Sequence, residues 1–168
     1  MKRNLFAILM VLFITHCSKE KINVYSIYKT DAYGSLVGDA PNDEQWKNTS
    51  FSRSELSLFD ELDTANLSGT QLPIINTGGY AYPNPFSDQL RVSASLVQPL
   101  NGYIVLKYVV VNNQMKIVQK GAARMHIGSF IHFAILADFG AGNYRLYFTF
   151  SSDGHEHFFK SWGNIKKI

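Results

Sequence analysis

Two prolines one residue apart constrain the middle of this chain, in the stretch Ala81-Tyr82-Pro83-Asn84-Pro85-Phe86-Ser87-Asp88. Each proline fixes its own φ and pushes the residue before it into an extended conformation. Because neither proline has an N–H for a sheet ladder, the stretch cannot be the middle of a central strand. We expect it to lead rigidly into a sandwich, with the rings of Tyr82 and Phe86 in the core.

Short segments in which apolar and polar residues alternate follow this stretch at regular spacing. The first runs over 90–96, where Leu90, Val92, Ala94 and Leu96 share one face. We expect further segments over 103–111, 115–119, 125–136, 144–150 and 156–162, with a possible break at Gly128-Ser129. About seven such strands separated by turn residues predict a mainly β fold, an Ig-like antiparallel β-sandwich.

A short helix is predicted before the prolines. Ser52-Arg53-Ser54-Glu55 has the form of a capping box, and Leu56, Phe59 and Leu62 then place one apolar stripe on a helix of about ten residues, 52–62. A helix this short must dock on something. We expect it to cover the apolar face that Val105, Val109 and Val111 give to one strand; a partner site is the alternative. Upstream, 22–28 has the composition of a short strand.

The N-terminus has the features of an export signal. Lys2 and Arg3 precede an apolar run over 5–14, which is too short to span a membrane and suits a secretory signal. Cys17, the one cysteine of the chain, follows. This arrangement resembles a bacterial lipoprotein signal peptide, 1–16, which implies that Cys17 is lipidated and anchors the protein to a membrane. An ordinary signal peptide with an incidental cysteine is the alternative.

The net charge gives no support for a nucleic-acid-binding surface, and the cysteine content excludes an internal disulfide. Loss of Lys2 and Arg3 with the leader lowers the formal net charge from +3 to +1, since two charges leave. This balance gives no electrostatic footprint for nucleic acid. With one cysteine the chain has no internal disulfide, so its core must supply the stability.

Two further short motifs resemble signals of exported proteins in Bacteroidetes-type bacteria. Ser18-Lys19-Glu20-Lys21 is similar to the signal for lipoprotein export to the cell surface, which implies display at the outer membrane; periplasmic retention and a plain charged tether are the alternatives. Asp63-Thr64-Ala65 is similar to an O-glycosylation acceptor, which implies a sugar on Thr64; a helix-ending turn is the alternative.

The C-terminal half resembles a known export domain. The matching residues are Tyr82, Pro83, Asn84, Pro85 and Phe86, then Leu90, Val92, the 109–111 hairpin strand, Leu136, the 141–146 run and the Lys-Lys-Ile tail. Together, 80–168 is similar to the Ig-like C-terminal sorting domain of the type IX secretion system. The resemblance implies recognition by the export machinery and removal by a sortase-like peptidase.

Size argues that the domain is retained instead. The Gly-, Thr- and Pro-rich stretch 66–80 is the best boundary, and it divides the chain into a signal peptide (1–16), a tether and lead-in (17–79) and a sandwich domain (80–168). Cleavage near Gly78-Gly79 would leave about sixty mature residues, which hardly hold a core.

No catalytic constellation is present in the sequence, so we expect neither an enzyme nor a cofactor. His155 and His157 are weak metal candidates, because they share one strand face but fall short of the usual three or four ligands. Outward-facing rings would suit a glycan or protein partner, and core packing is the alternative; the candidates are Tyr103, Tyr147, Phe159 and Trp162.

The sequence therefore predicts a non-catalytic cell-envelope lipoprotein that presents an Ig-like sandwich for interaction or adhesion at the outer membrane. A type IX sorting module and a carbohydrate-binding accessory lipoprotein are the alternatives.

Overall fold

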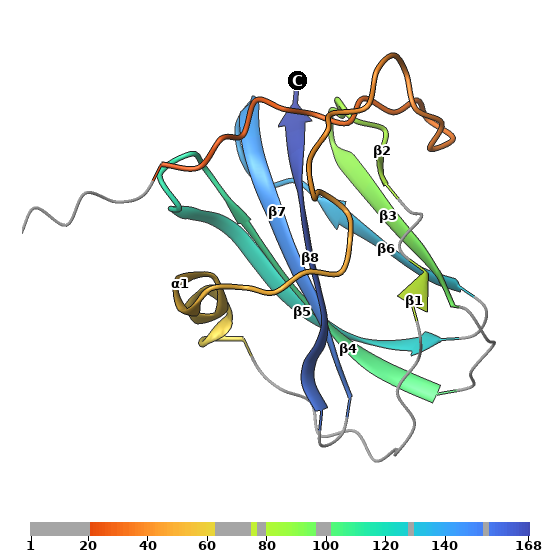
Figure 1. The fold of residues 1–168 in the computed structure, drawn as a ribbon, viewed down its shortest axis with the longest axis vertical. Coiled ribbons are helices and arrows are strands. Elements are labelled where there is room, and N and C mark those ends of the chain that lie inside the picture. The colour runs from red at the N-terminus through yellow and green to blue at the C-terminus, as the bar shows by residue number, and fades with distance from the viewer. Residues whose placement is uncertain (1–20, 63–74, 77–79, 97–101, 128–129, 153–154) are drawn as a thin grey trace, which may run out of the picture.

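Two antiparallel sheets make up most of the computed structural model, which describes residues 21–62, 75–76, 80–96, 102–127, 130–152 and 155–168 (Figure 1). The helices are α1 (Arg53–Leu56) and the 3₁₀ helix η1 (Ser57–Phe59). The strands are β1 (Ile75–Asn76), β2 (Ala81–Tyr82), β3 (Gln89–Leu96), β4 (Gly102–Val111), β5 (Ile117–Ile127), β6 (Phe130–Leu136), β7 (Gly142–Ser152) and β8 (His155–Lys167).

The first sheet is built on β3, which pairs with β6 on one side and with β1 and β2 on the other. The second sheet has the order β5-β4-β7-β8. All of these pairings are antiparallel. The predicted mainly β, antiparallel sandwich is therefore confirmed.

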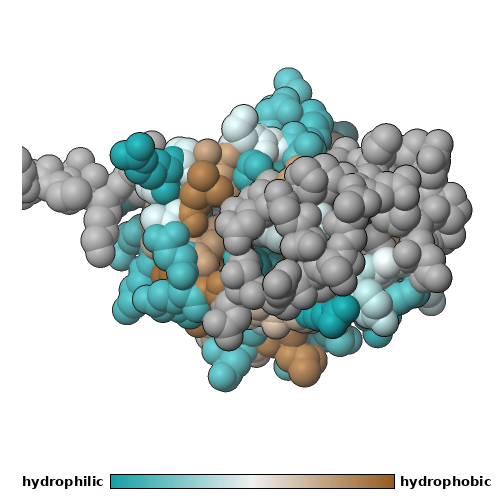
Figure 2. Space-filling model, turned by 90° about the horizontal axis from the view of Figure 1, so that it is seen from below, coloured by the Kyte–Doolittle hydropathy of each residue, from teal (hydrophilic) through white to brown (hydrophobic). Residues whose placement is uncertain are grey.

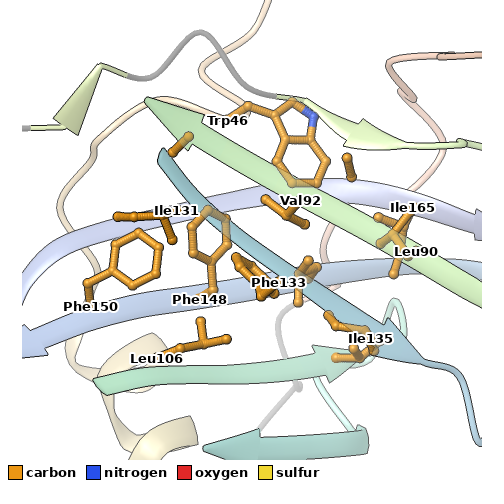
Figure 3. Close-up of a cluster of buried hydrophobic side chains, with 14 of the residues drawn as sticks. Trp46, Leu90, Val92, Leu106, Ile131, Phe133, Ile135, Phe148, Phe150 and Ile165 are labelled. Carbon is orange, nitrogen blue, oxygen red and sulfur yellow. The ribbon is translucent and has the colours of Figure 1, made fainter. Parts of the chain in front are cut away.

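Side chains that alternate along the strands form the core between the sheets. Every second residue of β6 is buried, and Leu90 and Val92 of β3 point the same way. Phe148 and Phe150 of β7 meet Phe133 from the opposite sheet at ring-centroid distances of 5.4 and 6.4 Å (Figure 3). The alternation has period two, so each strand gives one face to this core.

The second sheet is apolar on its other face too, and the helical segment covers it (Figure 1). Phe51 and Phe59 pack on Val109, Val111 and Tyr147, with Leu56 and Leu62 beside them. The predicted capping box is confirmed, and so is the docking on Val109 and Val111; Val105 lies outside this cluster. The predicted length is wrong: α1 has four residues and ends in a 3₁₀ turn. Serine hydroxyls in this segment compete with the backbone N–H groups for the carbonyls that would extend the helix. The Ser57 hydroxyl, for example, donates to the Ser54 carbonyl.

The lead-in also closes the free edge of β8. The Trp46 and Thr49 N–H groups donate to the carbonyls of Trp162 (2.7 Å) and Lys160 (2.9 Å). The Asn164 N–H donates to Gln45 Oε1 (2.6 Å). An open edge would expose these groups to pairing with another chain, so the lead-in protects the second sheet.

Two local predictions about strands need correction. Residues 22–28 form no strand, although Val24 and Tyr28 are buried. β5 runs unbroken through 120–124, which the sequence left outside any strand. Gly121 does not interrupt it, because the Tyr108 ring of β4 packs over that glycine, 2.6 Å from where a Cβ would stand. Of the two alternatives for 125–136, one strand or two, the second holds, because β5 and β6 belong to different sheets.

The C-terminus and the start of the described chain lie at one end of the sandwich. The C-terminus, the β4–β5 hairpin and the chain just after residue 21 are all at the top of Figure 1. Seen from the other end, the coloured residues form a narrow hydrophobic band with hydrophilic residues alongside (Figure 2).

Candidate functional site

A groove of about 590 Å³ lies between α1 and the tip of the β4–β5 hairpin. Ser52, Ser54, Glu55, Ser57 and Leu58 form its helical wall. Gln114 and Met115 of the hairpin, Ile22 of the lead-in, and Arg145 and Tyr147 of β7 complete it. Its volume falls in the range of small-ligand sites, roughly 300–1,000 Å³.

Tyr147 lies at the base of the groove. Its ring is buried and meets Phe51 edge to face at 5.3 Å, and its hydroxyl lies 3.8 Å from Met115 Sδ. Burial raises the pKa of the phenol to about 12, against the opposing effect of Arg145. The hydroxyl therefore stays protonated at neutral pH, and it donates its proton to the Met115 sulfur.

Arg145 supplies a fixed positive charge on the wall of the groove. Its Nε donates to Asn164 Oδ1 (2.9 Å) and its terminal nitrogen donates to the Asn23 carbonyl (2.6 Å). The guanidinium also stacks on the Trp162 ring, 3.9 Å from the ring centre. These contacts hold the side chain in one position before any ligand arrives.

Glu55 is the only acid among the described residues that line the groove. One of its oxygens accepts hydrogen bonds from the N–H (2.8 Å) and the hydroxyl (2.9 Å) of Ser52, which makes the carboxylate part of the helix cap. Fixed charges and hydroxyl groups of this kind favour binding of a polar ligand.

Of the four rings that could have faced outward, one is half exposed and the others are covered. Tyr103 is outward-facing and 50% exposed, with Arg124 over its ring at 4.2 Å. Phe159 is buried between the sheets, Tyr147 lies under the helical segment, and Trp162 is partly buried beneath Arg145. The alternative of core packing holds for Phe159 and Tyr147, because the lead-in covers the outer face of the second sheet.

The proline stretch forms an internal connection. Asn84 is fully buried between cis peptide bonds that precede Pro83 and Pro85. Its side-chain amide donates to the carbonyls of Tyr28 (3.0 Å) and Asn164 (3.1 Å), and its oxygen accepts from the Lys166 N–H (3.0 Å). The stretch therefore joins the lead-in to the last strand.

The two rings of the stretch lie in different places. Phe86 is buried in the main core, as predicted. The core position predicted for Tyr82 is wrong: Ala81 points inward, so Tyr82 faces the other side and packs over Gly34 of the lead-in. Tyr82 also lines a second hollow of about 340 Å³ on the outer face of the first sheet, with Arg91 and His132.

Other predicted sites lie wholly or partly outside the described residues. Cys17 and Thr64 are not described. The backbone of His155 and His157 belongs to β8, but their side chains are not described. Within the described part of the chain there is no group of three or more potential metal ligands, and no helix is long and apolar enough to cross a membrane.

Comparison with known proteins gives little support for any assignment. No protein-family model matches the chain, and no curated protein matches it. Among solved structures, it is similar to a glycosyl hydrolase family 2 member from Bacteroides cellulosilyticus DSM 14838, with 10% identity and a TM-score of 0.33. The similarity covers 52% of this chain and 14% of that chain. The comparisons name no family.

Sequence reasoning missed the groove. Its walls come from four segments that are distant in the chain: residue 22, 52–58, 114–115 and 145–147. The capping box correctly placed Glu55, but no local pattern brings Glu55 to Arg145. Only the docking of the helical segment on the second sheet creates this site.

Proposed function

We propose that this protein is a non-catalytic cell-envelope lipoprotein, anchored at the outer membrane through Cys17, whose retained β-sandwich binds a protein or glycan partner. One observation carries the proposal: the segment that follows the predicted anchor is built into the sandwich. Residues 22–62 border both cores and cover the β8 edge.

This packing favours retention of the sandwich over its use as a removable sorting module. Trp46 and Tyr28 belong to the main core, and Phe51 and Phe59 to the second one. Cleavage between the lead-in and the sandwich would separate residues that share these cores. An anchored protein that keeps both parts leaves them intact.

The groove is the site that we propose for the partner. It has a fixed cation in Arg145 and several serine hydroxyls. Groups of this kind hydrogen-bond to sugar hydroxyls or to peptide carbonyls and carboxylates. Both ligand classes therefore belong to the same proposed function.

The anchor is tested by metabolic labelling with a radioactive fatty acid in a bacterial host that processes lipoproteins. We expect label in the wild-type chain at full mature length, and none in Cys17→Ser. A His16→Ala variant serves as a control that alters the neighbouring residue and keeps the thiol. An unlabelled wild-type protein, or a labelled fragment that ends before Tyr82, would contradict the proposal.

A further inference from the structure

We propose that one end of the sandwich rests directly against the lipid surface; this inference rests on the proposed anchor at Cys17. The membrane-facing end is the one that carries the 30–37 loop, the β4–β5 hairpin and the C-terminal Ile168. The partner of this surface is the bilayer interface itself.

The length of the tether supports this orientation. Ile22 is already bound to the fold, since its N–H donates to the Asn113 carbonyl of the hairpin (3.0 Å). From Cys17 to Ile22 the chain reaches at most about 18 Å when fully extended. β8 alone has 13 residues, which span roughly 43 Å. The hairpin end must therefore stay close to the lipid, and the opposite end cannot replace it.

Exposed apolar side chains gather at the same end. Most of the exposed large hydrophobic residues in the described chain lie on its loops or at the strand ends that reach it: Tyr25, Tyr33, Leu36, Val37, Ile117, Leu136 and Ile168. Tyr33 is 91% exposed at the tip of its loop. Tyrosine and aliphatic side chains suit the boundary between headgroups and acyl chains.

Two exposed rings belong to the opposite end, Tyr103 near the start of β4 and Phe130 at the start of β6. An orientation with the molecule lying on its side would place α1 or β5 on the lipid. The distribution of exposed apolar residues favours the end-on arrangement.

Charge contributes little to the contact. This end carries exposed charges of both signs, with lysines at Lys29, Lys116 and Lys166 and carboxylates at Asp39, Asp88 and Asp138. The apolar and aromatic side chains must therefore supply the attraction, and the contact should be insensitive to salt.

The test uses the full-length lipidated protein in vesicles of phosphatidylethanolamine and phosphatidylglycerol with brominated acyl chains. Lipid occupies the Cys17 thiol, so a second cysteine can carry a single bimane fluorophore. We compare Tyr33→Cys and Val37→Cys with the matched control Tyr103→Cys, an exposed tyrosine at the opposite end. Near-ultraviolet circular dichroism verifies the fold of each variant.

We expect several-fold stronger quenching at positions 33 and 37 than at 103. Adding about 0.5 M NaCl, which screens interactions between exposed charges, should leave the quenching unchanged. Equal quenching at all three positions, or the strongest quenching at 103, would overturn the orientation while the anchor stands. The mass of the N-terminal peptide tests the anchor separately: an unmodified Cys17 refutes the proposed function and, with it, the tether on which the orientation depends.

Discussion

Asn84 is the side chain through which three distant segments of the chain are joined. It is fully buried, and its three hydrogen bonds reach the backbone of the lead-in at Tyr28 and of β8 at Asn164 and Lys166. An asparagine can satisfy donors and acceptors at once, which aspartate and alanine cannot. Its role in the fold is thus independent of whether the surrounding proline stretch is also an export signal.

Replacing Asn84 should be costly. Asn84→Ala removes the partners of three backbone groups, and we expect a loss of about 3 kcal/mol in the free energy of unfolding. Urea denaturation measures it. Asn112→Ala is the matched control, because the Asn112 oxygen accepts only from exposed N–H groups in the hairpin; we expect about 1 kcal/mol there. Equal losses in the two variants would contradict the central role of Asn84.

Gly163 is required by the close approach of Trp46. A Cβ at position 163 would stand 2.1 Å from the indole ring, so we expect Gly163→Ala to displace Trp46 and to destabilise the fold by about 1–3 kcal/mol. Tryptophan emission and urea denaturation report both effects. Gly140→Ala, where nothing lies within 4 Å, should change neither; a silent Gly163→Ala would show that the indole is loosely packed.

Tyr147 gives the fold an alkaline limit. Its folded pKa of about 12 lies above its unfolded value of 10.0, so its contribution is complete below pH 10 and is lost as the pH rises through 12. Between pH 9 and 11.5 the wild type should lose about 2 kcal/mol more than Tyr147→Phe. Denaturation at both pH values measures the difference. Tyr33→Phe, at an exposed site, should lose as much stability as the wild type over this pH range. An equal loss in Tyr147→Phe and the wild type would contradict the role of Tyr147.

At the scale of elements, the helical segment depends on its cap. α1 has only four residues, so it has almost no stability of its own. Ser52 and Glu55 satisfy each other's backbone N–H groups at its start. We expect Ser52→Ala to cost about 1 kcal/mol in urea denaturation. Arg53→Ala keeps the cap and should be nearly neutral; similar losses in both variants would show that Phe51 and Phe59 alone hold the segment.

Local sequence patterns predicted the strands and the helix cap better than the contacts between segments that are distant in the sequence. Alternation in β3 and the capping box at Ser52 are properties of neighbouring residues, and they are correct in the structure. The cover over β8 is different, since the bond from Asn164 to Gln45 joins residues 119 positions apart. Neither that cover nor the groove beside Arg145 has a local signature, so both were absent from the prediction.

At the scale of the whole molecule, the described residues form two cores that share the second sheet. One lies between the sheets, and the other lies between the second sheet and the helical segment. The lead-in contributes Tyr28 and Trp46 to the first and Phe51 and Phe59 to the second. A sequence boundary rich in glycine and proline therefore does not separate the packing of the two sides.

The isolated segment 80–168 should consequently fail to fold. Each large aromatic side chain removed from a core costs about 3–5 kcal/mol, and the lead-in supplies four of them against a total stability of roughly 5–15 kcal/mol. Its loss also opens the β8 edge to association. We expect segment 80–168 to be aggregated or unfolded by size-exclusion chromatography and NMR, whereas 22–168 should give a monomeric, cooperative fold. A well-dispersed spectrum from 80–168 would instead support the sorting module, because a removable domain must fold without the chain that precedes it.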